Sequence, residues 1–145
     1  MEWKEEAIEK LKRYKAMQTA AKNIPEQICM LEHSAVSLRS GSDLKVGGSS
    51  NVRSRENAMI NNLAERQELE WSLARVQQWL AVMNRGLDAL TPEEIIILQK
   101  MYLFPERGAV DRLCSDLGVE QATVYRKRDK ALHRFTVAMY GFPET

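Results

Sequence analysis

Apolar residues recur at helical spacing along most of the chain, and the clearest repeat lies in its middle. Its members alternate spacings of four and three: Leu69, Leu73, Val76, Leu80, Met83, Leu87 and Leu90. A 3.5-residue repeat is typical of helices that pack lengthwise against another helix. The pattern predicts a long helix over residues 55–89. Upstream the repeat turns polar at Asn62 and Arg66, which indicates looser pairing or a device that sets the register.

A similar apolar repeat occupies the N-terminal part of the chain. Its members are Leu11, Tyr14, Met17, Ala21, Ile24, Ile28, Leu31, Ala35 and Leu38. Pro25 interrupts it. Because proline lacks a backbone donor and clashes with the preceding turn, it costs about 3 kcal/mol in a helix interior. We therefore expect a break or a sharp kink at Pro25.

Glycine, serine and charged residues dominate residues 40–54, between the two repeats. Such a segment buries too little apolar surface to offset the entropy of ordering, so we expect a mobile linker. Two apolar repeats of similar period, joined by a linker, predict an antiparallel helical hairpin over residues 1–90. Pairing of the same seam between two chains, which would give a homo-oligomer, is the alternative.

The C-terminal part, residues 91–145, predicts three shorter helices. Thr91, Pro92 and Glu94 form a helix start with a capping box, and the sequence FPERG at 104–108 ends that helix. Two further apolar stripes flank Gly118: Val110, Leu113 and Leu117 precede it, and Val119, Val124, Ala131, Leu132 and Phe135 follow it. Glycine can adopt the left-handed conformation that a tight turn between helices needs.

These features predict a helix-turn-helix unit that folds by itself or nearly so. Its last helix should end near Tyr140, where Gly141 and Pro143 follow. One turn of that helix carries Lys127 and Arg128 where an aliphatic residue would be expected, so a basic stem should lie over the core.

Charge is distributed unevenly over the C-terminal part. Residues 91–120 hold six acidic and three basic side chains, whereas residues 121–145 hold five basic and two acidic ones. The bases are concentrated on the second helix of the helix-turn-helix, where contact with DNA phosphates would require them. A solvated helical face is the alternative, and the turn geometry favours DNA contact over it.

The spacing LTPEE…AVDRLCSDLGV…TVYRKRDKALHRF resembles region 4 of bacterial sigma factors. The whole chain resembles a family of small prophage-encoded proteins of Gram-positive bacteria, which combine an N-terminal helical segment, a Ser/Gly-rich gap and a sigma region 4-like C-terminus. The resemblance implies a phage transcription regulator. Sigma region 4 typically has charged residues early in its recognition helix, where this chain has Gln121, Ala122 and Thr123. This departure argues against recognition of an ordinary sigma promoter element.

Recognition helices enter the major groove of duplex DNA by their N-terminal part. The expected base or groove contacts are Gln121, Ala122, Thr123, Tyr125 and Arg126. The expected phosphate contacts, which would fix the register, are Lys127, Arg128, Lys130 and Arg134. The helical seam would dimerise the protein or dock on RNA polymerase.

Several other classes of function are disfavoured. The net charge is +1, no apolar run approaches the 18 residues of a membrane helix, and the N-terminus lacks the apolar core of a signal peptide. Two lone cysteines favour a reducing cytoplasm. His33 and His133 have no metal-ligand spacing, and we expect no metal, no cofactor and no catalytic activity.

Two questions remain open from the residues alone. The alternative function is a non-catalytic phage assembly or DNA-packaging protein that uses the coiled coil for interaction. Trp71 and Trp79 lie eight residues apart on one predicted helix; the spacing favours core positions for both, with an interface patch as the alternative.

Overall fold

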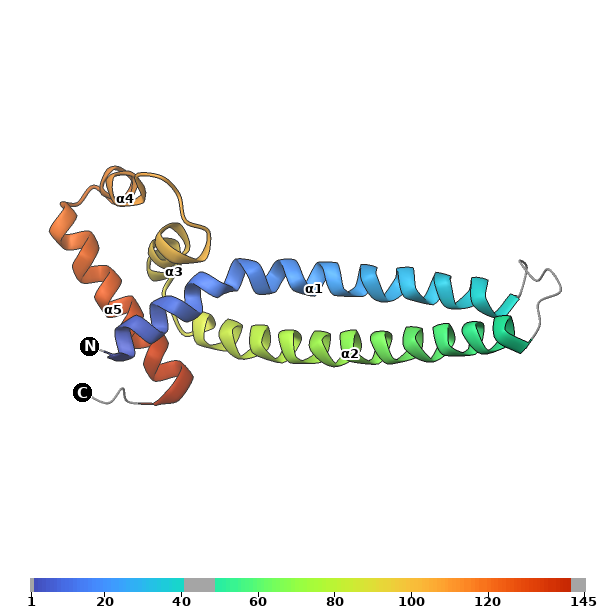
Figure 1. The fold of residues 1–145 in the computed structure, drawn as a ribbon. Coiled ribbons are helices and arrows are strands. Elements are labelled where there is room, and N and C mark those ends of the chain that lie inside the picture. The colour runs from blue at the N-terminus through green and yellow to red at the C-terminus, as the bar shows by residue number, and fades with distance from the viewer. Residues whose placement is uncertain (1, 41–48, 142–145) are drawn as a thin grey trace. The chain divides into compact units, whose positions relative to one another are not determined.

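The computed structural model describes residues 2–40 and 49–141. Its elements are α1 (Glu2–Ser40), α2 (Ser49–Asp88), α3 (Pro92–Leu98), the π-helical turn η1 (Gln99–Leu103), α4 (Ala109–Leu117) and α5 (Gln121–Tyr140) (Figure 1). The described residues contain no strand, which confirms the predicted all-α class.

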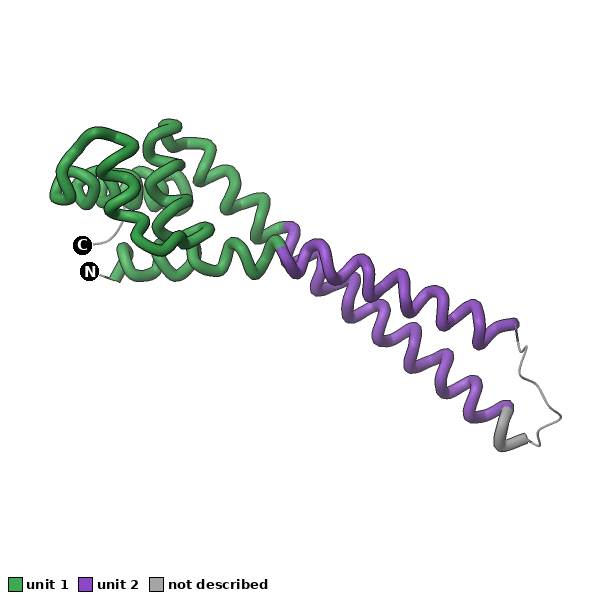
Figure 2. Tube along the Cα trace, turned by 90° about the horizontal axis from the view of Figure 1, so that it is seen from above, with its two compact units in different colours: residues 1–18, 78–145 green, residues 19–77 purple. Residues whose placement is uncertain are grey.

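The chain divides into two compact units (Figure 2). Unit 1 comprises residues 1–18 and 78–145, and unit 2 comprises residues 19–77. The boundary expected at residue 90 therefore lies inside unit 1. The reason is a shared core, because the first turns of α1 and the last turns of α2 bury side chains together with α5.

Unit 1 has two groups of buried apolar side chains. The larger combines α1, α2, the α3–η1 segment and α5: Ala7, Leu11, Tyr14, Met83, Leu87, Leu90, Leu98, Tyr102, Leu103, Ala131, Leu132 and Phe135. The smaller lies within the helix-turn-helix and consists of Ile97, Leu113 and Val124, with half-buried side chains, among them Cys114 and Leu117, packed against it. Helix α5 contributes to both groups and so is fixed along most of its length.

Unit 2 is an antiparallel pair formed by the remaining parts of α1 and α2, which run side by side in both views (Figures 1 and 2). The seam therefore pairs two helices of one chain. Asn62 is buried within it, and its side-chain amide donates to the backbone oxygen of Leu31 at 2.8 Å. Arg66 in turn donates to the Asn62 carbonyl oxygen at 2.8 Å. A buried amide satisfied at only one alignment of the helices supports the register-setting interpretation.

Two expectations about the long helices require correction. Helix α1 continues through Pro25, so the expected break is wrong; the packed turns on both sides outweigh a local cost of about 3 kcal/mol. Helix α1 ends at Ser40 and α2 begins at Ser49, so residue 40 and residues 49–54, assigned above to the linker, are helical. The rest of the expected linker, residues 41–48, lies outside the described residues, as does Pro143.

Candidate nucleic-acid interface

The turn between α4 and α5 has the geometry of a helix-turn-helix. Gly118 adopts φ 65° and ψ 37°, the left-handed conformation, as expected from its position between the two stripes. The next amide, of Val119, donates to the backbone oxygen of Cys114 at 3.2 Å and so closes the end of α4. Val124, the first fully buried residue of α5, then packs with Leu113 and Ile97. These contacts fix the angle at which α5 leaves the turn.

The start of α5 presents its side chains to solvent. Gln121, Ala122, Tyr125 and Arg126 are exposed, and Thr123 is half-buried. The Arg126 guanidinium lies 3.5 Å from the Thr123 hydroxyl oxygen, at the limit of a hydrogen bond. The five residues expected to reach base edges therefore lie together on the first two turns of one helix, as a helix that enters a groove by its N-terminus requires.

As expected, a basic side chain covers the core at the turn that carries Lys127 and Arg128, and it is that of Arg128. Its guanidinium hydrogen-bonds Asp129 at 2.8 Å and lies 5.0 Å from the centre of the Tyr125 ring. Burial raises the pKa of the Tyr102 hydroxyl beside it, an effect that the positive charge of Arg128 opposes. Burial alone would raise the pKa of Asp129, but the hydrogen bond and charge of Arg128, with a smaller contribution from Lys4, hold it below its ordinary value.

Three of the four expected phosphate contacts have a carboxylate partner in unit 1. Arg128 pairs with its neighbour Asp129, as described, and Lys127 forms an ion pair with Glu93 at the start of α3. The Arg134 guanidinium lies 3.4 Å from the Glu94 carboxylate. Lys130 is exposed and forms no ion pair with any residue that the structure describes.

Glu94 is held more firmly than the other partners. The capping box predicted for α3 is present: the Thr91 hydroxyl accepts from the Glu94 amide at 3.2 Å, and the Glu94 carboxylate accepts from the Thr91 amide at 3.0 Å. Glu94 is buried, whereas Glu93 is considerably exposed. A capping carboxylate fixed in this way can hold Arg134 in place, whereas Glu93 is free to release Lys127.

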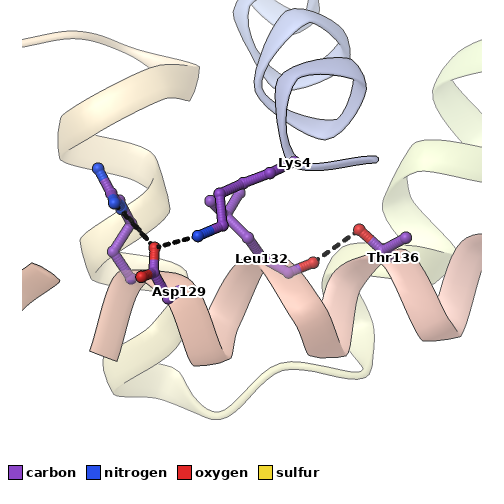
Figure 3. Close-up of polar contacts among 5 residues, drawn as sticks. Lys4, Asp129, Leu132 and Thr136 are labelled. Carbon is purple, nitrogen blue, oxygen red and sulfur yellow. Dashed lines mark hydrogen bonds and ion pairs between the residues drawn. The ribbon is translucent and has the colours of Figure 1, made fainter. Parts of the chain in front are cut away.

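Helix α1 contributes to the same surface, which the sequence analysis missed. The Trp3 ring meets the His133 ring edge-on at 5.7 Å between centroids. The Lys4 ammonium lies 3.3 Å from the Asp129 carboxylate (Figure 3). Residues of α1, of the start of α3 and of α5 line a groove of about 950 Å³ on this surface. The signal was present, because Trp3 and Ala7 extend the apolar repeat of α1 backwards from Leu11.

Along the far half of α5, the buried Thr136 hydroxyl donates to the backbone oxygen of Leu132 at 2.8 Å (Figure 3). This hydroxyl therefore needs no partner outside its helix. Phe135 is fully buried in the same stretch. Leu132, Phe135 and Thr136 thus belong to the core of unit 1, whereas the expected DNA contacts of α5 lie between Gln121 and Arg134.

The chain has no match among family models, curated proteins or solved structures. Across residues 2–40 and 49–141, no group of three His, Cys, Asp or Glu side chains is placed to hold a metal ion. None of the described helices has an apolar stretch long enough to cross a membrane.

Proposed function

We propose that unit 1 binds duplex DNA through α5 and that the protein acts in transcription regulation, as a phage or prophage regulator similar to sigma region 4. The observation that carries the proposal is the start of α5. A left-handed glycine turn directs into solvent a helix whose first two turns carry Gln121, Thr123 and Arg126. Glutamine can form a paired hydrogen bond with adenine, and threonine offers a hydroxyl and a methyl group to base edges.

The ion pairs of unit 1 divide the basic side chains into two classes. Arg126 and Lys130 are exposed and have no carboxylate within ion-pair distance among the described residues, so they can meet phosphates without losing a partner. Lys127 and Arg134 would share their charge between phosphate and glutamate. We therefore assign the larger part of the phosphate attraction to Arg126 and Lys130.

A salt titration tests this assignment. The full chain is first used to select a preferred duplex from a random pool, and binding to that duplex is then measured by fluorescence anisotropy at several salt concentrations. Arg126→Ala with Lys130→Ala should reduce the slope of log K against log salt by about 0.9 for each lost phosphate contact. The matched control is Lys12→Ala with Arg13→Ala, which removes the same charge from exposed positions of α1.

The proposal fails if the Arg126/Lys130 variant remains folded and still binds the selected duplex with the slope of the parent. A phage assembly or packaging protein, with unit 2 as its interaction element, would then be the better account. Equal losses in the variant and the control would show an effect of net charge alone, which would also contradict the assignment to α5.

Substitution of Glu93 gives an independent test, in which DNA binding should become stronger and not weaker. Glu93→Gln removes the carboxylate that pairs with Lys127 and also removes a negative charge near the phosphate path. DNA affinity should rise several-fold, in the range of a partly exposed charge pair worth about 1 kcal/mol or less. Glu9→Gln, at an exposed position of α1, is the control and should have little effect. Weaker binding by Glu93→Gln would show that Lys127 needs Glu93 in order to be positioned.

A further inference from the structure

Unit 2 leaves a second apolar stripe of α2 uncovered. Val52, Ile60, Leu63 and Trp71 expose 48%, 64%, 48% and 69% of their surfaces. At 3.6 residues per turn these four positions fall within an arc of about 100° on the helix. The seam that packs on α1 is centred about 120° away on the same helix, so the stripe does not face α1. The core position expected for Trp71 is therefore wrong, while Trp79 does pack against the core of unit 1.

We propose that this stripe binds the same stripe of a second copy of the chain, in an antiparallel and two-fold symmetric dimer. The order of residues carries the proposal. Ile60 and Leu63 lie at equal distances on either side of a point between residues 61 and 62, and so do Val52 and Trp71. Two copies aligned about that point would therefore place Ile60 opposite Leu63 twice at the centre and Val52 opposite Trp71 at both ends.

Charges beside the stripe follow the same symmetry. Arg53 and Glu70 lie at equal distances from the midpoint, on opposite edges of the stripe, and Glu56 and Gln67 do so along its centre. Antiparallel pairing brings each arginine near a glutamate of the second copy and sets Glu56 against an uncharged side chain. Parallel pairing would instead place both Arg53 at one end of the interface and both Glu70 at the other, so that no arginine could meet a glutamate. Charge complementarity therefore selects a second copy in the antiparallel orientation.

Unit 2 buries few of its side chains by itself, and burial of the rest would favour dimerisation. Within residues 19–77, the side chains that the structure describes include only three buried ones: Ile24, Ala35 and Asn62. Two helices in a single layer cannot cover more than one face of each other. A second hairpin would bury the exposed stripe and a tryptophan at each end, and tryptophan is enriched among the residues that dominate binding energy.

The first experiment measures the mass of the full chain in solution by sedimentation equilibrium. The parent should be a dimer. Ile60→Glu places four acidic groups, two Glu56 and two substituted positions, around the symmetry axis and should give a monomer. Met30→Glu is the control, because Met30 is similarly exposed on α1 but lies outside the stripe, and that variant should remain dimeric. A monomeric parent, or variants that behave alike, would overturn the proposal; circular dichroism checks that all remain helical.

A charge exchange tests the alignment. Arg53→Glu and Glu70→Arg should each raise the Kd of the dimer about tenfold, since each introduces two like-charge contacts per dimer. The variant that carries both changes restores opposite charges at both ends and should regain the affinity of the parent. If the double variant binds more weakly than either single variant, the two residues do not meet.

Cross-linking tests the orientation. Two chains are made in a background of Cys29→Ser and Cys114→Ser, one with Glu56→Cys and one with Gln67→Cys. Antiparallel pairing predicts disulfides only in a mixture of the two, whereas parallel pairing predicts them in each chain alone. Disulfides within the unmixed samples and not between the two chains would refute the antiparallel dimer. The proposal does not rest on DNA binding, because none of these measurements involves DNA.

Discussion

Gly86 of α2 lies against side chains of α5, and replacing it with alanine should destabilise unit 1. A Cβ atom at this position would lie 2.6 Å from Sδ of Met139 and 2.9 Å from Cε1 of Phe135. The Met139 side chain is half-buried and can move, but Phe135 is fully buried and has no free space. Overpacking of this kind costs about 1–3 kcal/mol. Alanine regains about 1 kcal/mol of helix propensity, so the expected net loss is about 1 kcal/mol.

The measurement must report on unit 1 alone. Trp3 and Trp79 belong to unit 1 and Trp71 to unit 2, so tryptophan fluorescence in a Trp71→Phe background follows the unfolding of unit 1 in urea. Ala81→Gly, at an exposed position of the same helix, measures the propensity difference without the packing change. Ala81→Gly should lower the free energy of unfolding by about 1 kcal/mol. Adding this amount to the loss measured for Gly86→Ala gives the cost of the clash alone.

A double-mutant cycle with Met139 identifies which side chain causes the loss of stability. If the Cβ atom clashes with Met139, then Gly86→Ala should cost less in a Met139→Ala background, where the nearest contact is gone. A Gly86→Ala variant more stable than its parent by the full propensity difference would refute the reasoning. Such a result would mean that α2 and α5 are farther apart than the distances above.

Three further predictions concern the stability of unit 1. Leu113→Ala, which empties a fully buried site, should cost about 2–5 kcal/mol in the same urea assay, and Leu117→Ala should cost less because Leu117 is only half-buried. Asp129→Asn should lower the Tm above about pH 5, and this loss should shrink as the pH is lowered further. The folded-state pKa of Asp129 lies below the unfolded value, so the stabilisation by its charged form is lost as the pH falls through the folded pKa. In contrast to the self-folding unit expected from the sequence, the fragment 88–145 should melt without cooperativity by circular dichroism, because it lacks the partners that α5 has in α1, such as Leu11; a sharp transition would contradict the shared core.

The local signals in the sequence predicted the C-terminal elements well. The capping box at Thr91 and the left-handed turn at Gly118 each depend on a few neighbouring residues, and both are confirmed. The DNA-contacting role of α5 stays a prediction. Pro25 shows the limit of a local argument, because the cost of a proline in a helix is fixed by its neighbours whereas the compensating packing is spread along 39 residues.

The ion pairs of the candidate interface could not be predicted from spacing. Lys127 and Glu93 are 34 residues apart, and Lys4 is still farther in sequence from Asp129, so only the packing of α1 and α3 on α5 brings them together. The division at residue 90 was misleading for the same reason. The apolar repeats pass through residues 18 and 78 without a change of spacing, so they give no sign of where the long helices stop packing only on each other and begin to pack on α5 as well.

Unit 2 is an insertion within unit 1, since residues 19–77 lie between the two segments that form the latter. This order has a consequence for synthesis on the ribosome. The hairpin can pair as soon as α2 has emerged, whereas the first turns of α1 must wait for Phe135 and its neighbours, more than a hundred residues later. During that interval Ala7, Leu11 and Tyr14 have only the α2 and α3–η1 side of their core, because Ala131, Leu132 and Phe135 are not yet made. The charged residues between them, Glu9, Lys10, Lys12 and Arg13, would keep the waiting segment soluble until the last helix is made.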